Sequence, residues 1–132
     1  MLVNLHISNY ALIERLDVEF GRGLSIITGE TGAGKSIILG AIDLLRGRRA
    51  DSSALRDKTM KAVVEAEFDV HNNEAVQRWL ASQDYELGED NVLVLRREIS
   101  PTGRSRAFIN DSPANLQAMQ ELTLALLDIP SQ

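Results

Sequence analysis

The sequence contains no cysteine, only two histidines and few aromatic side chains. Without cysteine, the chain can form no disulfide, no thiolate metal site and no cysteine nucleophile. The histidines, His6 and His71, lie far apart in the sequence and lack the spacing of a metal-ligand pair. A disulfide-bonded secreted domain and a thiol enzyme are therefore excluded.

Long apolar runs and an excess of positive charge are also missing. No apolar stretch approaches the ~18 residues that cross a bilayer, and Asn4 and His6 interrupt the segment where a signal peptide would need its apolar core. These absences predict a cytoplasmic protein with no membrane partner. The formal net charge of −5 argues against strong nucleic-acid binding by this segment alone. The length suits one domain, residues 1–132.

The most informative feature that is present is the motif at residues 29–36. It consists of Gly29, Glu30, Thr31, Gly32, Ala33, Gly34, Lys35 and Ser36, and it matches G-x-x-x-x-G-K-[S/T] without a mismatch. In such a loop, backbone N–H groups surround the α- and β-phosphates of a nucleotide. Lys35 would reach the β- and γ-phosphates, and the Ser36 hydroxyl would bind Mg²⁺. The motif therefore predicts a nucleoside triphosphate site.

The segments that flank the motif are the ones this chemistry needs. Residues 24–28 are typical of a short buried strand, and residues 36–45 of a helix with Gly47 as its C-terminal cap. Strand, glycine loop and helix N-terminus together concentrate positive potential on a phosphate. Arginines at positions 46, 48 and 49 follow the helix; they suit its negative end, or alternatively contact with nucleic-acid phosphates.

Alternating apolar and polar residues predict strands elsewhere in the chain. The expected strands are residues 3–7, 13–20, 64–70, 92–99 and 104–110. A turn at residues 8–10 would make the first two an antiparallel hairpin, and a turn at residues 100–103 would join the last two. Glu65, Glu67 and Asp69 then share a solvent face, which is a simpler interpretation than a metal cluster. His6 is likewise expected on a solvent face.

Two further helices and a last strand complete the expected elements. Residues 74–83 form a helix that Asn72 or Asn73 can cap, with Trp79 turned inward. A second helix is expected from Ser112 as N-cap, with proline at its first position, to about residue 122. Residues 123–129 are apolar and are expected to form a final strand.

The order of these elements predicts an α/β fold with a mixed sheet whose N-terminal portion is antiparallel. Two strands precede the strand of the phosphate loop, and hairpin-connected strands follow it. A compact nucleotide kinase would instead place its phosphate loop after the first strand of a parallel sheet.

Several segments together are similar to one family. Residues 5–13, 26–36, 64–68, 95–100 and 103–110 resemble the start of the bacterial RecN family of DNA repair ATPases, and the resemblance spans essentially the whole chain. The phosphate loop is shared by many families. By contrast, the segment GRSRAFIN after an RREI strand is found in far fewer families.

The resemblance implies a P-loop NTPase of the ABC/SMC head type. In SMC-like proteins an N-terminal and a C-terminal half-head fold into one ATPase head, and two heads enclose two ATP molecules. This chain would be the N-terminal half-head, with ATP and Mg²⁺ as cofactors. Its partners would be the C-terminal half-head, a second head in a homodimer and DNA. The chain alone is expected to be inactive, whereas the assembled protein would act in double-strand break repair.

The resemblance also implies catalytic roles for Lys35 and Gln132. Family members carry a glutamine just after a strand that ends in Asp-Ile, where it contacts Mg²⁺ and the attacking water. Here Asp128 and Ile129 end the expected strand, and Gln132 takes the glutamine position, although Pro130 stands where the family has histidine. The Mg²⁺ aspartate and the catalytic glutamate would belong to the C-terminal half.

Two other interpretations stay open at the level of sequence. In one, the chain is a complete small phosphotransferase in which Asp128 holds Mg²⁺ and Arg104 and Arg106 close over the phosphates. In the other, it is a non-catalytic ATP-binding or DNA-scaffold module. The two strands before the phosphate loop favour the half-head.

Overall fold

The computed structural model describes residues 1–20 and 32–127, of which residues 32–35 and 127 are described by their backbone alone. The described strands form one six-stranded sheet in the order β2-β1-β3-β4-β5-β6. The strands are β1 (Leu2–Tyr10), β2 (Ile13–Glu19), β3 (Ala62–Asp69), β4 (Val92–Ile99), β5 (Ser105–Ile109) and β6 (Ser112–Ala114). The helices are α1 (Gly32–Leu45), α2 (Glu74–Ser82), α3 (Leu116–Leu127) and the short 3-10 helix η2 (Ser52–Ala54).

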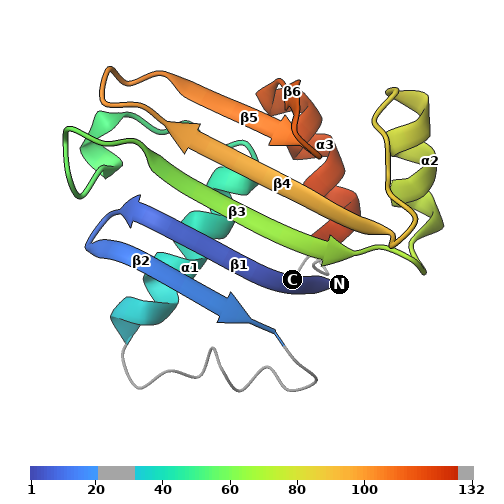
Figure 1. Ribbon diagram of the computed structural model, residues 1–132, viewed down its shortest axis with the longest axis horizontal. Coiled ribbons are helices and arrows are strands. Elements are labelled where there is room, and N and C mark those ends of the chain that lie inside the picture. Colours follow the sequence, from blue (N-terminus) through green and yellow to red (C-terminus); the bar gives the residue numbers. More distant parts are fainter. Residues whose placement is uncertain (21–31, 128–132) are drawn as a thin grey trace.

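The two faces of the sheet differ in chemistry because side chains alternate along each strand. Helices α1 and α3 cover one face, and α2 lies at the end where β3 stops and β4 starts (Figure 1). The covered face is apolar and buried; it includes Leu5, Ile7, Val64, Ala66, Leu93, Leu95 and Ile109. The other face carries polar and charged side chains. Among the described residues, no helix has the length and apolar character that crossing a membrane requires.

The predicted N-terminal hairpin is confirmed, but its turn lies later than expected. β1 and β2 pair antiparallel, and β1 continues through residues 8–10 to end at Tyr10. Asn9 is buried, and its side-chain amide donates to the carbonyls of Asp57 (3.0 Å) and Met60 (2.9 Å). The polar residue that indicated a turn therefore ties the strand to a distant loop, while Ala11 takes a positive φ of 55° at the turn.

The helix predicted from Ser112 is wrong at its start. Residues 112–114 form β6, in which Pro113 pairs with Phe108 of β5. The turn between the strands is Asn110-Asp111, both at positive φ (48° and 67°), as a tight hairpin requires. Proline suits β6 because the strand lies at the edge of the described sheet and needs fewer N–H donors. Helix α3 begins instead at Leu116.

The final strand predicted at residues 123–129 is wrong as far as residue 127, and residues 128 and 129 lie outside the described part. Helix α3 runs to Leu127, and the hydroxyl of buried Thr123 donates back to the carbonyl of Met119 at 2.7 Å. Met119, Leu122 and Leu126 are buried at helical spacing. A continuous apolar run does not by itself distinguish a strand from a buried helix.

Other predicted elements are confirmed. β3 and β4 lie where the alternation placed them, and β5 covers most of the expected return strand. Helix α2 is capped by Asn73, whose side chain accepts from the backbone N–H of Val76 at 3.0 Å. Every described strand pairing is antiparallel. The strand expected at residues 24–28, which would make the sheet mixed, lies outside the described residues.

Candidate functional site

Helix α1 begins inside the phosphate-loop motif. Its first residue is Gly32, whereas the sequence predicted a start at Ser36. Helix geometry leaves the first N–H groups of any helix without an intrahelical acceptor, and here they include those of residues 32–34 of the motif. The helix therefore presents donors without intrahelical acceptors, and its positive end, at the motif. Gly29, Glu30 and Thr31 lie outside the described residues.

Packing against the sheet fixes the orientation of α1. Ile38, Ala41 and Leu45 are buried at spacings of three and four residues, which makes one face of the helix part of the core. Gly40 lies against Tyr10 of β1, since a Cβ there would be 2.8 Å from the tyrosine hydroxyl. The side chain of Ser36 is exposed. A hydroxyl at this position is accessible to a bound ion.

The C-terminal end of α1 is closed by the glycine that the sequence predicted. Gly47 has a φ of +96°, and its N–H donates to the Leu44 carbonyl at 3.1 Å. The N–H of Arg48 donates to the Asp43 carbonyl at 3.1 Å, which completes a Schellman motif. Arg46 and Arg48 both pair with the Asp43 carboxylate, at 3.5 and 3.6 Å. These arginines therefore have acidic partners at the helix end.

A buried arginine on β4 is the main feature that the sequence analysis missed. Arg97 is fully buried on the apolar face of the strand, between Leu95 and Ile99. Its Nη1 donates to the carbonyls of Leu44 (2.6 Å) and Arg48 (2.8 Å). The alternation of β4 contained the signal, because it places Arg97 on the same face as the apolar residues.

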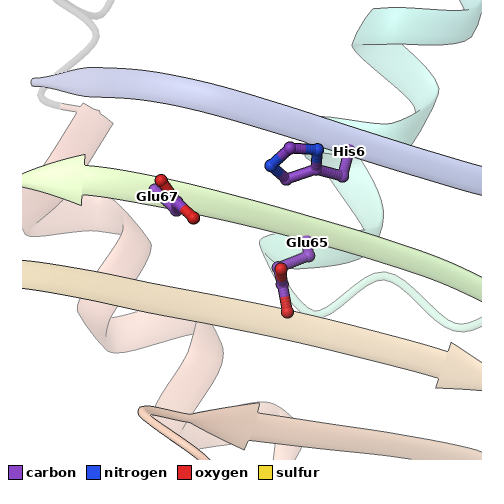
Figure 2. Close-up of side chains that lie close together, drawn as sticks. All are labelled: His6, Glu65 and Glu67. Atoms are coloured by element: carbon purple, nitrogen blue, oxygen red, sulfur yellow. The ribbon is translucent and has the colours of Figure 1, made fainter. Parts of the chain in front are cut away.

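The acidic face of β3 shares its surface with His6 of β1 (Figure 2). Ligand atoms of His6, Glu65 and Glu67 lie within 4.8 Å of one another. Glu67 accepts from the Asn4 amide at 2.8 Å, and Glu65 lies 3.5 Å from Arg96. The prediction that these side chains lie on the outer face is confirmed, and their contacts are those of a polar ladder across the strands.

His6 also contacts Asp17 on the neighbouring strand. Its Nδ1 lies 2.6 Å from a carboxylate oxygen of Asp17, and Arg15 binds the other oxygen at 3.0 Å. The hydrogen bond from His6, and after it the contact with Arg15, lowers the pKa of Asp17. His6 is therefore paired with a carboxylate on β2, and both side chains line a hollow of about 340 Å³ on this face together with Arg15 and Glu65.

Arg104 and Arg106 share a surface, as their spacing predicted. Together with Lys61, Glu98, Ser100 and Thr102 they line a hollow of about 330 Å³ on the β4–β5 hairpin. Lys61 pairs with Glu98 at 3.3 Å. The hollow has three cationic and one anionic side chain, so its net charge is positive.

The remaining predicted site residues are not described. Asp128 and Gln132 belong to residues 128–132, which lie outside the described part of the chain. The side chain of Lys35 is also outside it. Their roles therefore stay predictions.

These elements have the fold of the N-terminal part of an SMC-type head domain. One solved SMC ATPase, studied for its ATP-driven dimerization and DNA-stimulated activation, superposes with a TM-score of 0.68 at 23% identity; the match covers 98% of this chain and 81% of that one. An Smc head bound to the C-winged helix domain of ScpA superposes with a TM-score of 0.68 at 19% identity, and the match covers 99% of this chain and 42% of that one.

The model of the RecF/RecN/SMC N terminal domain matches residues 1–129, and the chain belongs to this family. The DNA repair protein RecN of Vibrio cholerae serotype O1 is 43% identical over 132 residues, which are all of this chain and 24% of that protein. RecN of Bacillus subtilis strain 168 is 42% identical over 132 residues, again all of this chain and 23% of that protein. The chain thus spans about a quarter of the length of these relatives.

Proposed function

We propose that this chain is the ATP-binding N-terminal part of a RecN-like ATPase that acts in the repair of DNA double-strand breaks, in the cytoplasm and at the nucleoid. The observation that carries the proposal is the start of α1 at Gly32, inside a complete phosphate-loop motif, on an SMC-head fold. The identity of about 40% to RecN proteins over the whole chain supports the repair role.

The residues of the motif fit a triphosphate with Mg²⁺. The N–H groups at the start of α1 that have no intrahelical acceptor would bind the phosphate oxygens, and residues 29–31 would complete the cradle. Lys35 would place its charge on the β- and γ-phosphates, and the exposed hydroxyl of Ser36 would ligate the ion. The bound Mg²⁺ would neutralise charge that develops on the phosphates.

Binding the phosphates is only part of a hydrolytic site. Phosphoryl transfer to water also requires a group that orients the attacking water and charges that stabilise the transition state. Gln132 is proposed for the first task, and for contact with Mg²⁺. The C-terminal half-head and a second head, in a homodimer, would supply the base and the remaining charges.

DNA is the proposed partner of the assembled protein. The hollow formed by Lys61, Arg104 and Arg106 has the positive charge that a phosphodiester backbone requires. The hydroxyls of Ser100 and Thr102 add uncharged donors beside these cations. The overall negative charge of the chain means that such contact would depend on this local surface.

Calorimetry with Mg-ATP tests the nucleotide site. Lys35→Ala removes a charged hydrogen bond worth about 1.5–3 kcal/mol, so the affinity should fall by about ten- to 150-fold. Lys58→Ala is the matched control, because within the described part of the chain its ammonium donates to the Ser52 and Ser53 carbonyls, outside the motif. Equal heats for wild type and Lys35→Ala would overturn the proposal.

A further inference from the structure

Arg97 joins the sheet to the C-terminal end of α1. Its guanidinium is fully buried, and both hydrogens of Nη1 are used by main-chain carbonyls, that of Leu44 in the last turn of α1 and that of Arg48 just beyond it. Nη2 donates to the hydroxyl of Ser105 at the start of β5. One side chain therefore contacts the helix, β5 and the segment after the helix.

The surroundings of Arg97 make this contact electrostatic as well as geometric. Among the described residues, no carboxylate pairs with Arg97, and its Nε has no hydrogen-bond partner. Burial lowers the pKa of the guanidinium, yet arginine stays charged in proteins. The compensating negative charge comes from the carbonyl end of the α1 dipole. The cation is therefore stabilised only while the helix end stays in place.

A second contact holds the same helix end from the other side. A Cβ on Gly47 would lie 2.9 Å from the carbonyl oxygen of Leu116 and 2.6 Å from Cγ of Gln120, both in α3. The end of α1 is thus enclosed between β4, through Arg97, and the first turns of α3, through Gly47. A planar guanidinium with fixed donor directions sets the position of the helix end more narrowly than apolar packing would.

The position of one helix end determines the position of the other. Helix α1 has 14 residues and is therefore about 21 Å long, so a tilt of about 3° at the anchored end moves the opposite end by about 1 Å. That opposite end carries residues 32–35 of the phosphate loop. Displacements of this size are large for groups that bind and position phosphates.

We infer that Arg97 is a positioning residue of the nucleotide site. It fixes the position of the carboxyl end of α1 and thereby the position of residues 32–35 of the motif at the other end of the helix. The inference rests on the proposed function of residues 29–36. It assigns to Arg97 no contact with the nucleotide itself.

The test compares Arg97→Met, Arg97→Lys and Ser105→Ala with Leu93→Ala in this chain. Leu93 is fully buried on the same strand and the same face, so its truncation destabilises the core but removes none of the hydrogen-bond partners of Arg97. Amide hydrogen exchange is measured at Gly47 and Arg48, whose N–H groups close the helix, and Mg-ATP affinity is measured by calorimetry below the unfolding transition of every variant.

Arg97→Met should speed exchange at Gly47 and Arg48 and weaken Mg-ATP binding about threefold or more. Arg97→Lys, which keeps the charge and one donor direction, should recover part of both losses. Leu93→Ala should lower the melting temperature while leaving both readouts at their wild-type values. Should Arg97→Met prove unfolded, Arg97→Lys and Ser105→Ala must still show intermediate losses in both readouts.

Two outcomes would overturn the inference about Arg97, and a third would refute the proposed nucleotide-binding function on which it rests. Equal Mg-ATP affinity in wild type and the Arg97 variants would show that the position of the carboxyl end of α1 does not affect nucleotide binding. The same loss of affinity in Leu93→Ala would show a general effect of stability. Absence of Mg-ATP binding by the wild-type chain would instead refute the proposed function, and the inference with it.

Discussion

At the scale of the residue, Gly47 combines two constraints that can be separated by experiment. Its φ of +96° lies in the region that side chains with a Cβ avoid, and α3 occupies the place where a Cβ would stand. Gly103, in the β4–β5 turn, has a similar φ of +89° but no atom within 4 Å of its Cβ position. The two glycines therefore share the backbone strain and differ in the packing.

We predict that Gly47→Ala destabilises the chain more than Gly103→Ala. Gly103→Ala should cost about 1–2 kcal/mol from the left-handed backbone alone. Gly47→Ala should cost more than that, because the Leu116 carbonyl is backbone and α3 must shift to admit a methyl group. Urea unfolding of the two variants measures the difference. Equal midpoints would show that α3 yields freely at this contact.

Single residues were predicted correctly where their role is local. Gly47 closes α1 and Asn73 caps α2, and each needs only its own helix to act. Asn9 and Arg97 were not understood from the sequence because their partners lie about 50 positions away. The prediction that a helix starts at Ser112 was wrong for a related reason, because residues 112–114 form a strand through their pairing with β5, which the local sequence does not reveal.

At the scale of the element, the β4–β5 hairpin carries the basic hollow. β4 supplies Glu98, and the turn and the return strand supply Arg104 and Arg106. Lys61, just before β3, completes the hollow across the sheet. Arg97 of the same hairpin, which also donates to Ser105, contacts the end of α1 on the opposite face. The hairpin therefore reaches both the basic hollow and the helix of the phosphate-loop motif.

We predict that Arg104→Ala with Arg106→Ala reduces DNA-stimulated ATPase activity in a full-length RecN-type protein that carries this segment. Loss of two phosphate contacts should also lower the salt slope of DNA binding by about 2. Affinity for Mg-ATP should stay at the wild-type value, because neither arginine belongs to the phosphate loop. The control is Arg15→Ala with Arg78→Ala, an equal charge change at two exposed arginines elsewhere. A wild-type salt slope would show that the hollow does not contact DNA.

Elements were predicted well where apolar and polar residues alternate and poorly where the run of apolar residues is continuous. The period-2 pattern of β3 and β4 determined both strands. Residues 123–127 are helical although their run of apolar residues suggested a strand, because burial on α3 follows a spacing of three and four residues. The early start of α1 was missed because glycines 32 and 34 have low helix propensity, which the geometry of the motif overrides.

At the scale of the whole molecule, the described part forms a layered unit with its helices α1 and α3 on one face of the sheet (Figure 1). The antiparallel arrangement and the half-head were predictable from the order of elements and from the family resemblance. The other groups of the proposed nucleotide site could not be predicted from local patterns, because under the proposed function they would belong to segments outside this chain, which spans about a quarter of the length of the RecN relatives.

We predict that the isolated chain binds Mg-ATP but hydrolyses it negligibly. The phosphate loop can position the triphosphate, yet positioning supplies neither a base for water nor a second set of charges for the transition state. Adding the C-terminal half-head of a RecN-type protein should restore turnover in a steady-state phosphate-release assay, and Lys35→Ala in the same mixture should abolish it. Robust turnover by the chain alone that is lost in Asp128→Asn would instead identify a complete small phosphotransferase. The topology opposes that outcome, because two antiparallel strands, β1 and β2, precede the motif.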